Sequence, residues 1–427
     1  MGCRLLKYLV MLPMFLPVIR TDGQQTMQKY VAENTNKLAT IQPDSNGDTD
    51  LEAVGQAIGD ARVVMLGEQD HGDAPTFLAK SRLIRYLHEK KGFNVLAFES
   101  DFFGLAEGWR RLSKDGEDID SFVRENVFGI WTGCNTCQDL FYSYIPQTFR
   151  SAQPLQLAGV DNQVFLSYST RQLVPWIDSV MREMELPIVN DPAYAARVLP
   201  LLDSLPKWFV RPKDTMQMGV CAAYLDTIRQ QAAIRIKEDD FRLLVMDNLI
   251  AELREFRVMG IDNNAIADIR DKQMAANLAW LTDVKYKGDK LIVWAASSHL
   301  GLATGRFPGM PFDTLPTMGS EYCRNPTHRG ETYVMGFTSY EGRAGRLGTR
   351  IYEVRAPRAG AFEKWIDPAL DYAFVDFKRY NLSYPQANEP FFLSGFGHIG
   401  SRGIWNRVFD GIIYIKNMYP CDKLSQR

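Results

Sequence analysis

The stretch Gly67-Glu-Gln-Asp-His-Gly72 places a carboxylate, Glu68, and an imidazole, His71, three residues apart. A carboxylate that accepts a hydrogen bond from one ring nitrogen of a histidine leaves the other nitrogen free to take a proton from water. Glu68 and His71 are therefore candidate catalytic residues. Each of them alone also fits a structural role, because a glutamate after a strand often lies at a helix start and a histidine between glycines is often part of a turn.

A lysine on the helix predicted to follow this stretch supplies a cation. The helical spacing places Lys80 three residues after Phe77 and four before Ile84, on the stripe that faces the core. A buried ammonium needs an anionic partner, and Glu68 or Glu99 could supply it. The alternative is a side chain that extends to the surface and keeps its charged end in water.

Short apolar runs at 62–66, 94–98, 154–160 and 290–296 are bounded by turn residues, and each has the length of a buried strand. The first two are separated by a helical pattern over 75–91, which is the spacing of a β-α-β unit and therefore of parallel strands. Strands of this kind form a sheet that is covered on both faces.

The ends of these strands carry polar side chains. In open α/β sheets, ligands bind beyond the carboxyl ends of parallel strands. Because burying several ionisable groups at one place costs free energy that function usually explains, a functional cleft is predicted at this edge. The residues concerned are Glu68 and His71, Glu99 and Asp101, Asp161, and Ser297, Ser298 and His299.

The rest of the chain adds helices and then more strands. Residues 170–281 have mostly helical periodicity and are predicted to form a helical insertion. After Gly330, β-rich segments at 332–337, 348–354 and 372–377 predict antiparallel pairing at one side of the sheet. The expected fold class is therefore α/β, with a central mixed, largely parallel sheet flanked by helices.

The length and charge of the chain limit its organisation and its partners. The sequence has 427 residues, a size that elaborated α/β domains reach without splitting, so residues 24–427 are expected to form one domain that carries the insertion. Lys plus Arg (49) nearly balance Asp plus Glu (51), and no basic run could follow a phosphate backbone. A small-molecule substrate is expected and nucleic acid is not; the oligomeric state is not indicated.

Residues 1–23 have the composition of a secretory signal peptide, with Arg4 and Lys7 ahead of an apolar stretch over 9–19. This stretch is too short to cross a membrane as a helix, so no stable membrane span is expected after removal of the signal. We therefore expect export, to the periplasm or out of the cell.

The cysteines beyond this segment include one close pair, Cys134 and Cys137. No second C-x-x-C and no nearby histidine accompanies it, so it is a poor zinc site. In an exported protein, a local disulfide between these two residues is one interpretation, and two unpaired loop cysteines are the other.

Several familiar catalytic motifs are absent from the sequence. It has no G-x-S-x-G nucleophile elbow, no P-loop and no H-E-x-x-H zinc motif. The segment 395–400 satisfies G-x-G-x-x-G, but no β-α-β unit follows it, so we interpret it as a loop. A standard serine hydrolase mechanism is therefore not expected.

Several stretches together resemble the erythromycin esterase family. They are Leu66-Gly-Glu-Gln-Asp-His-Gly72, the helix over 80–87, Gly92-Phe-Asn-Val-Leu-Ala-Phe-Glu99, Gly129-Ile-Trp131, Gly159-Val-Asp161, Arg270-Asp271 through Asn277, and Trp294-Ala-Ala-Ser-Ser-His299. The resemblance implies an α/β core with a helical insertion and a water molecule activated by His71. In some members of that family the reaction is hydrolysis of a macrolide lactone.

The resemblance also implies roles for individual residues. Glu68 and His71 match the family's catalytic pair, Glu99 its acid at the end of a strand, and His299 a second histidine. Lys80 stands where the family usually has an arginine and is expected among the catalytic residues. The expected substrate-binding residues are Asp161, Trp131 and Arg270.

The mechanism expected from these roles is hydrolysis of an ester or lactone without a covalent enzyme intermediate and without a cofactor. Neutral His71 takes a proton from water. Lys80 or His299 stabilises the developing oxyanion, and Glu99 orients Lys80 or the water.

Two departures from the family pattern leave alternatives open. Ala296 and Ser297 stand where the family has a histidine and an asparagine, so the substrate need not be a macrolide. A ligand-binding protein without activity is one alternative. Because more distant relatives of this fold bind metals, a metal-dependent hydrolase or peptidase is the other. The donors of its Zn²⁺ or Mn²⁺ site would be Glu68, His71, Glu99 and His299.

Overall fold

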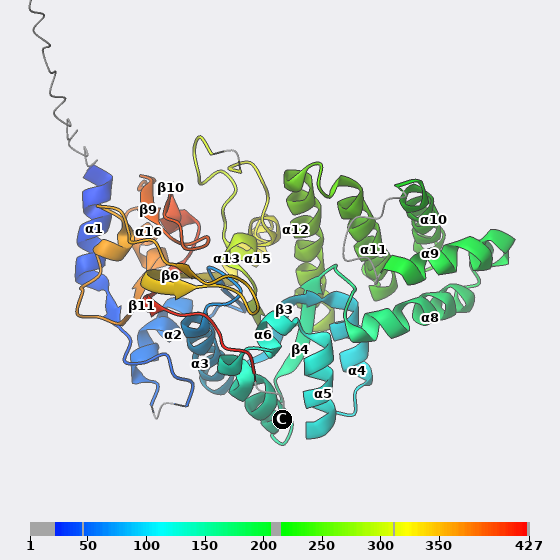
Figure 1. Ribbon diagram of the computed structural model, residues 1–427, viewed down its shortest axis with the longest axis horizontal. Helices are drawn as coiled ribbons and strands as arrows, with labels where there is room; N and C mark the ends of the chain where they lie inside the picture. Colours follow the sequence, from blue (N-terminus) through cyan, green and yellow to red (C-terminus); the bar gives the residue numbers. More distant parts are fainter. Residues whose placement is uncertain (1–21, 45–46, 206–214, 311, 425–427) are drawn as a thin grey trace, which may run out of the picture.

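A mixed β-sheet forms the centre of the computed structural model, which describes residues 22–44, 47–205, 215–310 and 312–424 (Figure 1). Nine strands of these described residues belong to the sheet. In spatial order they are β1 (Asn36–Lys37), β8 (Tyr372–Asp376), β11 (Gly411–Met418), β6 (Thr332–Ala344), β2 (Val63–Leu66), β5 (Lys290–Trp294), β3 (Phe93–Asp101) and β4 (Gln156–Asp161), with β7 (Tyr352–Glu353) paired to β6. The strands from β11 to β4 are parallel to one another, whereas β1, β7 and β8 pair in the antiparallel sense. The predicted mixed, largely parallel sheet is confirmed.

The carboxyl-terminal strands differ from the expectation in one respect. Antiparallel pairing occurs between β6 and β7 and between β8 and β11, but β6 itself runs parallel to its neighbours β2 and β11 inside the sheet. The physical reason is burial. Residues 332–339 of β6 are all buried, which is the pattern of an interior strand covered on both faces rather than of an edge hairpin.

Successive side chains of β2 enter two different cores, because side chains alternate between the faces of a strand. Val64 and Leu66 belong to the core shared with α2, α3 and α5, whereas Val63 and Met65 belong to the core shared with α11 and α12. The sheet is thus covered on both faces, as predicted. The bounds of these helices are α2 (Glu52–Ile58), α3 (Ala74–Lys91), α5 (Gly116–Asn126), α11 (Phe241–Val258) and α12 (Asn263–Trp280).

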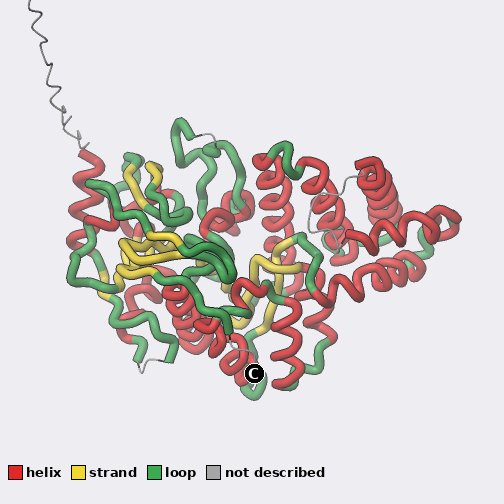
Figure 2. Tube along the Cα trace, viewed as in Figure 1, coloured by secondary structure: helices red, strands yellow, loops and turns green. Residues whose placement is uncertain are grey.

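Helices fill the described part of the segment between β4 and β5. Figure 1 shows α8 to α11 grouped at one end of the molecule, and in Figure 2 this end consists of helices and loops. This matches the helical character expected of residues 170–281. Besides α11 and α12, the helices there include α8 (Ser167–Glu183), α9 (Leu199–Ser204) and α10 (Thr215–Ala233).

The remaining elements are short apart from α1 (Asp22–Asn34). A separate hairpin of β9 (Phe391–Leu393) and β10 (Ser401–Gly403) encloses residues 395–400, so the interpretation of that glycine-rich segment as a loop is confirmed. The short helices are α4 (Trp109–Arg111), α6 (Gly129–Thr132), α7 (Ile145–Thr148), α13 (Ser297–Leu300), α14 (Met318–Tyr322), α15 (Pro326–Gly330) and α16 (Phe377–Ser383).

Two sequence-based expectations concern membranes and export. None of the described helices combines the length and the apolarity that crossing a bilayer requires. The expected signal peptide covers residues 1–23, and residues 1–21 lie outside the described part of the chain.

A disulfide joins Cys134 to Cys421, so both interpretations of the Cys134/Cys137 pair are wrong for Cys134. Cys137 is unpaired and buried. Backbone hydrogen bonds from Asn135 N to Asp422 O (3.0 Å) and from Leu424 N to Gly133 O (2.7 Å) place residues 422–424 beside residues 133–135. This long-range pairing brings the two Cα atoms to 5.6 Å, a normal distance for a disulfide.

Loss of this disulfide is expected to lower the free energy of unfolding by about 2–4 kcal/mol. The bridge joins residues 287 positions apart and so restricts the conformations of the unfolded chain. Urea denaturation of Cys421→Ser in a non-reducing buffer measures the effect. Cys323→Ser is the matched control, since that thiol is unpaired, and it should unfold like the natural chain. Equal denaturation midpoints for Cys421→Ser and the natural chain would contradict a stabilising bridge.

Candidate active site

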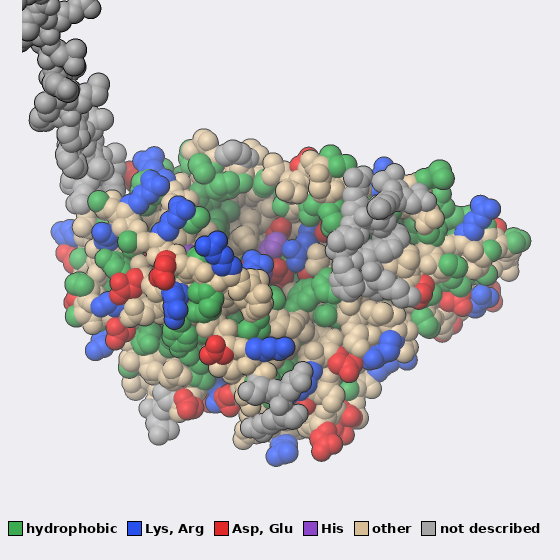
Figure 3. All heavy atoms as spheres, in the orientation of Figure 1, with side chains coloured by type: hydrophobic (Ala, Val, Ile, Leu, Met, Phe, Trp, Pro, Cys, Tyr) green, Lys and Arg blue, Asp and Glu red, His purple; other side chains and the backbone are tan. Residues whose placement is uncertain are grey.

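The side chains predicted at the strand ends meet at one edge of the sheet. Glu68 and His71 follow β2, Glu99 lies in the last part of β3, and α13 carries His299 after β5. Glu99 Oε1 lies 3.9 Å from His71 Nε2 and 3.3 Å from His299 Nε2. Figure 3 shows a hollow in the surface between the sheet-containing part and the helical part, with histidine, acidic and basic side chains on its floor. The predicted cleft is present.

Two glycines allow the loop 67–72 to approach its neighbours closely. A Cβ atom on Gly67 would clash with the side chain of Ser297, and one on Gly72 would clash with the backbone of Gly345, between β6 and β7. The glycines of this loop are therefore required for packing.

Glu68 is fully buried among three hydrogen-bond donors. Its Oε1 accepts from Trp131 Nε1 and from His71 Nδ1, both at 2.9 Å, and its Oε2 forms an ion pair with the Lys80 ammonium. Burial raises the pKa of Glu68, but the charge of Lys80 and the hydrogen bond from His71 outweigh burial and hold that pKa below 4.5. Glu68 is therefore a carboxylate at neutral pH.

His71 donates through Nδ1, because the Glu68 carboxylate can only accept, and Nε2 is left as the acceptor nitrogen. Within the described part of the chain, Nε2 has no hydrogen-bond partner, since 3.9 Å to Glu99 is too long for one. Burial lowers the pKa of His71, but the hydrogen bond to Glu68 and the charges of Glu99 and Glu68 raise it above 6.5. The side chain is 12% exposed and can be reached from the cleft.

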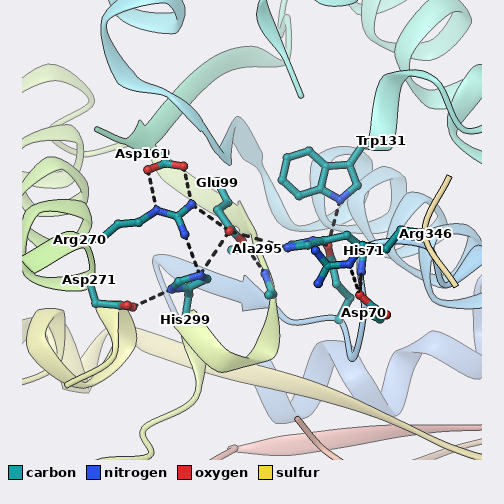
Figure 4. Close-up of polar contacts among 12 residues, drawn as sticks. Asp70, His71, Glu99, Trp131, Asp161, Arg270, Asp271, Ala295, His299 and Arg346 are labelled. Carbon is teal, nitrogen blue, oxygen red and sulfur yellow. Dashed lines mark hydrogen bonds and ion pairs between the residues drawn. The ribbon is translucent and has the colours of Figure 1, made fainter. Parts of the chain in front are cut away.

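Glu99 and His299 belong to a chain of alternating charges (Figure 4). Glu99 Oε2 accepts from the backbone N–H of Ala296 at 2.9 Å, and Glu99 Oε1 lies 3.2 Å from Arg270 Nη2. On its other side, His299 Nδ1 donates to Asp271 Oδ1 at 2.9 Å. Each acidic side chain is thus matched by a basic one.

These contacts determine which side chains are charged. Burial raises the pKa of Glu99, but His299, His71 and Arg270 outweigh burial and hold that pKa well below 4.5. Burial lowers the pKa of His299, but Asp271 and Glu99 raise it to about 10. At neutral pH the cleft therefore contains two fixed cations, the Arg270 guanidinium and the His299 imidazolium, on the far side of Glu99 from His71.

A sequence model of the erythromycin esterase family matches residues 88–418 of this chain. The chain belongs to the erythromycin esterase family. An erythromycin esterase type II from Escherichia coli is 46% identical to it, over 91% of this chain and 97% of that protein. Two solved structures share the fold. A Bacillus cereus protein has 16% identity and a TM-score of 0.73 over 94% of this chain and 99% of its own. A histidine-to-asparagine variant of the erythromycin esterase EreC, in its open conformation, has 17% identity and a TM-score of 0.65 over 92% and 99%.

Membership in the erythromycin esterase family confirms the resemblance seen in the sequence and makes the chain a hydrolase. The likeness to EreC also agrees with the α/β fold class. Membership in this family points to a small-molecule substrate.

Three expected site residues of this erythromycin esterase family member do not line the cleft. Lys80 is fully buried behind Glu68, and its ammonium contacts the carbonyl of Ala295 at 3.3 Å and the ring of Trp294, so it can neither extend to water nor contact a reacting oxygen directly. Trp131 and Asp161 are also fully buried.

Trp131 and Asp161 contact residues of the cleft. Trp131 lies on α6 and binds Glu68, and Asp161 binds Arg270 through two hydrogen bonds of 2.6 and 3.0 Å. Arg270 is the one expected substrate-binding residue that reaches the cleft, with 17% of its side chain exposed.

The two carboxylates expected to bind a metal already form ion pairs with basic side chains of this chain. Glu68 binds Lys80, and Glu99 binds Arg270 and His299. A metal ion would have to displace the groups that neutralise these carboxylates, so the side chains do not fit such an ion. Among the described ranges, no three or more His, Cys, Asp or Glu side chains are grouped in a way that could hold a metal.

Asp70 also supports this loop, although its sequence context does not indicate it. Asp70 Oδ1 accepts from the backbone N–H of His71 at 2.9 Å, and Asp70 binds Arg346 and the Tyr352 hydroxyl. Arg346 and Tyr352 come from the β6–β7 segment, far along the chain. No local pattern could have identified these two residues, because only the tertiary fold brings the β6–β7 segment beside Asp70.

Three buried side chains that are hydrogen-bonded in a row also support this loop. Asp73 Oδ2 accepts from the backbone of Asp70 at 2.9 Å, and Asp73 Oδ1 binds His398 Nε2 at 2.9 Å. His398 Nδ1 in turn lies 3.0 Å from Ser339 Oγ. The loop at 395–400, which follows β9, thus fixes the loop that carries His71.

Proposed function

We propose that this protein hydrolyses a carboxylic ester or lactone with water as the nucleophile and His71 as the general base. The observation that carries the proposal is the state of the His71 ring. Its Nδ1 is held by a buried carboxylate, Glu68, while its Nε2 faces the cleft without a partner among the described residues. An imidazole held in this way is oriented to remove a proton from water.

The proposed reaction has two steps and no covalent bond to the enzyme. A water molecule gives a proton to His71 Nε2 while its oxygen attacks the carbonyl carbon, which forms a tetrahedral oxyanion. The oxyanion then collapses, the bond to the leaving alkoxide breaks, and the alkoxide takes the proton from His71. Arg270 and His299 are the cations that would stabilise the oxyanion, since both are partly exposed in the cleft.

Lys80 is proposed as a positioning residue rather than a catalytic one. Its ammonium keeps Glu68 ionised, and the ionised carboxylate keeps the proton of His71 on Nδ1. Glu99 is proposed to hold His299 and Arg270 in place and to orient water beside His71 Nε2.

The test is a panel of chromogenic esters and lactones, with erythromycin included because the Escherichia coli relative is named an erythromycin esterase. Hydrolysis that persists after dialysis against a chelator supports water activated by His71. Activity that disappears with the chelator and returns with Zn²⁺ or Mn²⁺ would support a metal-dependent hydrolase instead. If none of these substrates is hydrolysed, even with metal added, the result would favour a ligand-binding protein without activity.

We expect kcat/KM to rise with increasing pH through an apparent pKa above 6.5, because His71 acts in its neutral form and its pKa is raised. The rate should fall again near pH 10, where His299 loses its proton. Glu68→Gln should move the acidic limb to lower pH, since the bond to Glu68 is the largest of the causes that raise the pKa of His71. An acidic limb that stays in place in Glu68→Gln would argue against His71 as the titrating base.

We also propose that the protein works outside the cytoplasm. The signal-like composition of residues 1–23 supports this location. The Cys134–Cys421 bridge supports it as well, because such bonds persist in oxidising compartments. Detection of the mature protein in a periplasmic or culture fraction, with its amino terminus beyond residue 19, is the measurement.

A further inference from the structure

A second cavity, separate from the catalytic cleft, is lined by four arginines and a single carboxylate. Its volume is about 430 Å³. The charged residues that line it are Arg306, Arg324, Arg329, Arg407 and Asp410.

The Arg329–Asp410 pair is part of the fold. The Arg329 guanidinium donates to both oxygens of Asp410, at 2.6 and 3.1 Å, and Asp410 also accepts from the backbone N–H of Val334 at 2.9 Å. Val334 lies near the start of β6 and Asp410 directly precedes β11. The pair therefore binds the amino-terminal ends of these strands, at the edge of the sheet opposite the one that carries His71.

Two of the other arginines have no acidic partner. Among the described residues, no carboxylate lies within 4.0 Å of the Arg306 or Arg407 guanidinium, whereas Arg324 pairs with Glu321 at 3.1 Å. Arg407 donates only to neutral oxygens, such as the carbonyl of Pro385 at 2.6 Å. Arg306 Nε is buried and has no hydrogen-bond partner in the described part of the chain.

Arg306 and Arg407 carry like charges on the lining of the same cavity. Burial and the nearby charge of Arg306 lower the pKa of Arg407, which means that the two cations repel each other inside the cavity. A bound anion between them would replace repulsion with two charge-assisted hydrogen-bonding contacts.

We propose that this cavity binds a phosphate group, either as the free ion or as the phosphomonoester of a small molecule. The planar guanidinium of arginine presents paired N–H donors whose spacing matches two oxygens of a phosphate. A volume of about 430 Å³ suits a small ligand. The formal charge of the whole chain, -2, gives no support to a polymeric anion such as nucleic acid.

The test is a titration of the full chain with inorganic phosphate at constant ionic strength, maintained with chloride and followed by thermal unfolding and calorimetry. The natural chain should show a saturable rise in Tm. Arg306→Gln should raise the dissociation constant for phosphate at least about tenfold, which is the loss of affinity expected when a charge-assisted contact is removed. Arg171→Gln on α8 is the matched control, because it makes the same charge change far from the cavity, and it should respond like the natural chain.

Two outcomes would overturn the site. One is the absence of any phosphate-dependent rise in Tm in the natural chain, and the other is an equal rise in the natural chain, Arg306→Gln and Arg171→Gln. If Arg306→Gln does not fold, Arg407→Gln replaces it. In phosphate-free buffer Arg306→Gln should have a Tm equal to or above that of the natural chain, because it relieves the repulsion. A lower Tm there would argue against an anion site between the two arginines.

A second arm distinguishes the two sources of phosphate. Glycerol 3-phosphate that binds at least about tenfold more tightly than inorganic phosphate would identify a phosphomonoester as the ligand. Equal or weaker binding would identify the free ion. Neither measurement uses hydrolysis, so its result is independent of whether His71 is the general base.

Discussion

Replacement of His71 by alanine is expected to lower kcat/KM for ester hydrolysis by about a hundred- to ten-thousand-fold, the range attributed to general-base catalysis. The free energy of unfolding should change little. Among the described residues, the side chain of His71 makes one hydrogen bond, to Glu68, and Glu68 keeps its contacts with Lys80 and Trp131 when the imidazole is removed. Steady-state kinetics and thermal unfolding of the same preparation measure both quantities.

The control for this prediction is a histidine outside the cleft. His88 is buried between the hydroxyl of Tyr144 (2.7 Å) and the carbonyl of Gln153 (2.9 Å), so His88→Gln should keep its activity. Full activity in His71→Ala would remove His71 from the mechanism. A large fall in Tm together with the loss of activity would instead identify His71 as a structural residue.

Lys80→Met is expected to have the largest effect on stability, a loss of about 3–5 kcal/mol in the free energy of unfolding. The substitution removes the ammonium and leaves the Glu68 carboxylate fully buried, with only Trp131 and His71 as hydrogen-bond partners. The loss should lie toward the lower end of that range, because these two donors remain. Urea denaturation gives the value.

A double variant separates the buried charge from the packing. When Glu68→Gln is added to Lys80→Met, no uncompensated charge is left in the interior, and most of the lost stability should return. Activity should stay below that of the natural chain, because His71 no longer has a carboxylate to orient it. A double variant that is less stable than Lys80→Met alone would show that the Lys80 side chain matters for its volume rather than for its charge.

Local patterns in the sequence were sufficient to predict most of the sheet. The apolar runs at 62–66, 94–98, 154–160 and 290–296 correspond to β2, β3, β4 and β5, and the helical pattern at 75–91 corresponds to α3. Strand periodicity and the length of apolar runs are local properties, so they can be read without knowledge of the fold.

The pairing of distant segments had no such local signal. β11 was not predicted, and Cys421, three residues beyond it, is the partner of Cys134. His398 likewise has its partner, Asp73, 325 residues away. These contacts depend on which segments the sheet brings together, and spacing along the chain does not determine that.

The sequence by itself determined that Glu68, His71, Glu99 and His299 share one edge of the sheet, because parallel strands place their carboxyl ends together and these residues follow those ends. Only the tertiary structure decided which side chains reach the cleft. Lys80, Trp131 and Asp161 lie at the same edge but are fully buried. The physical reason is that the exposure of a side chain depends on packing between elements far apart in the chain, whereas its place along a strand or helix depends only on its neighbours in sequence.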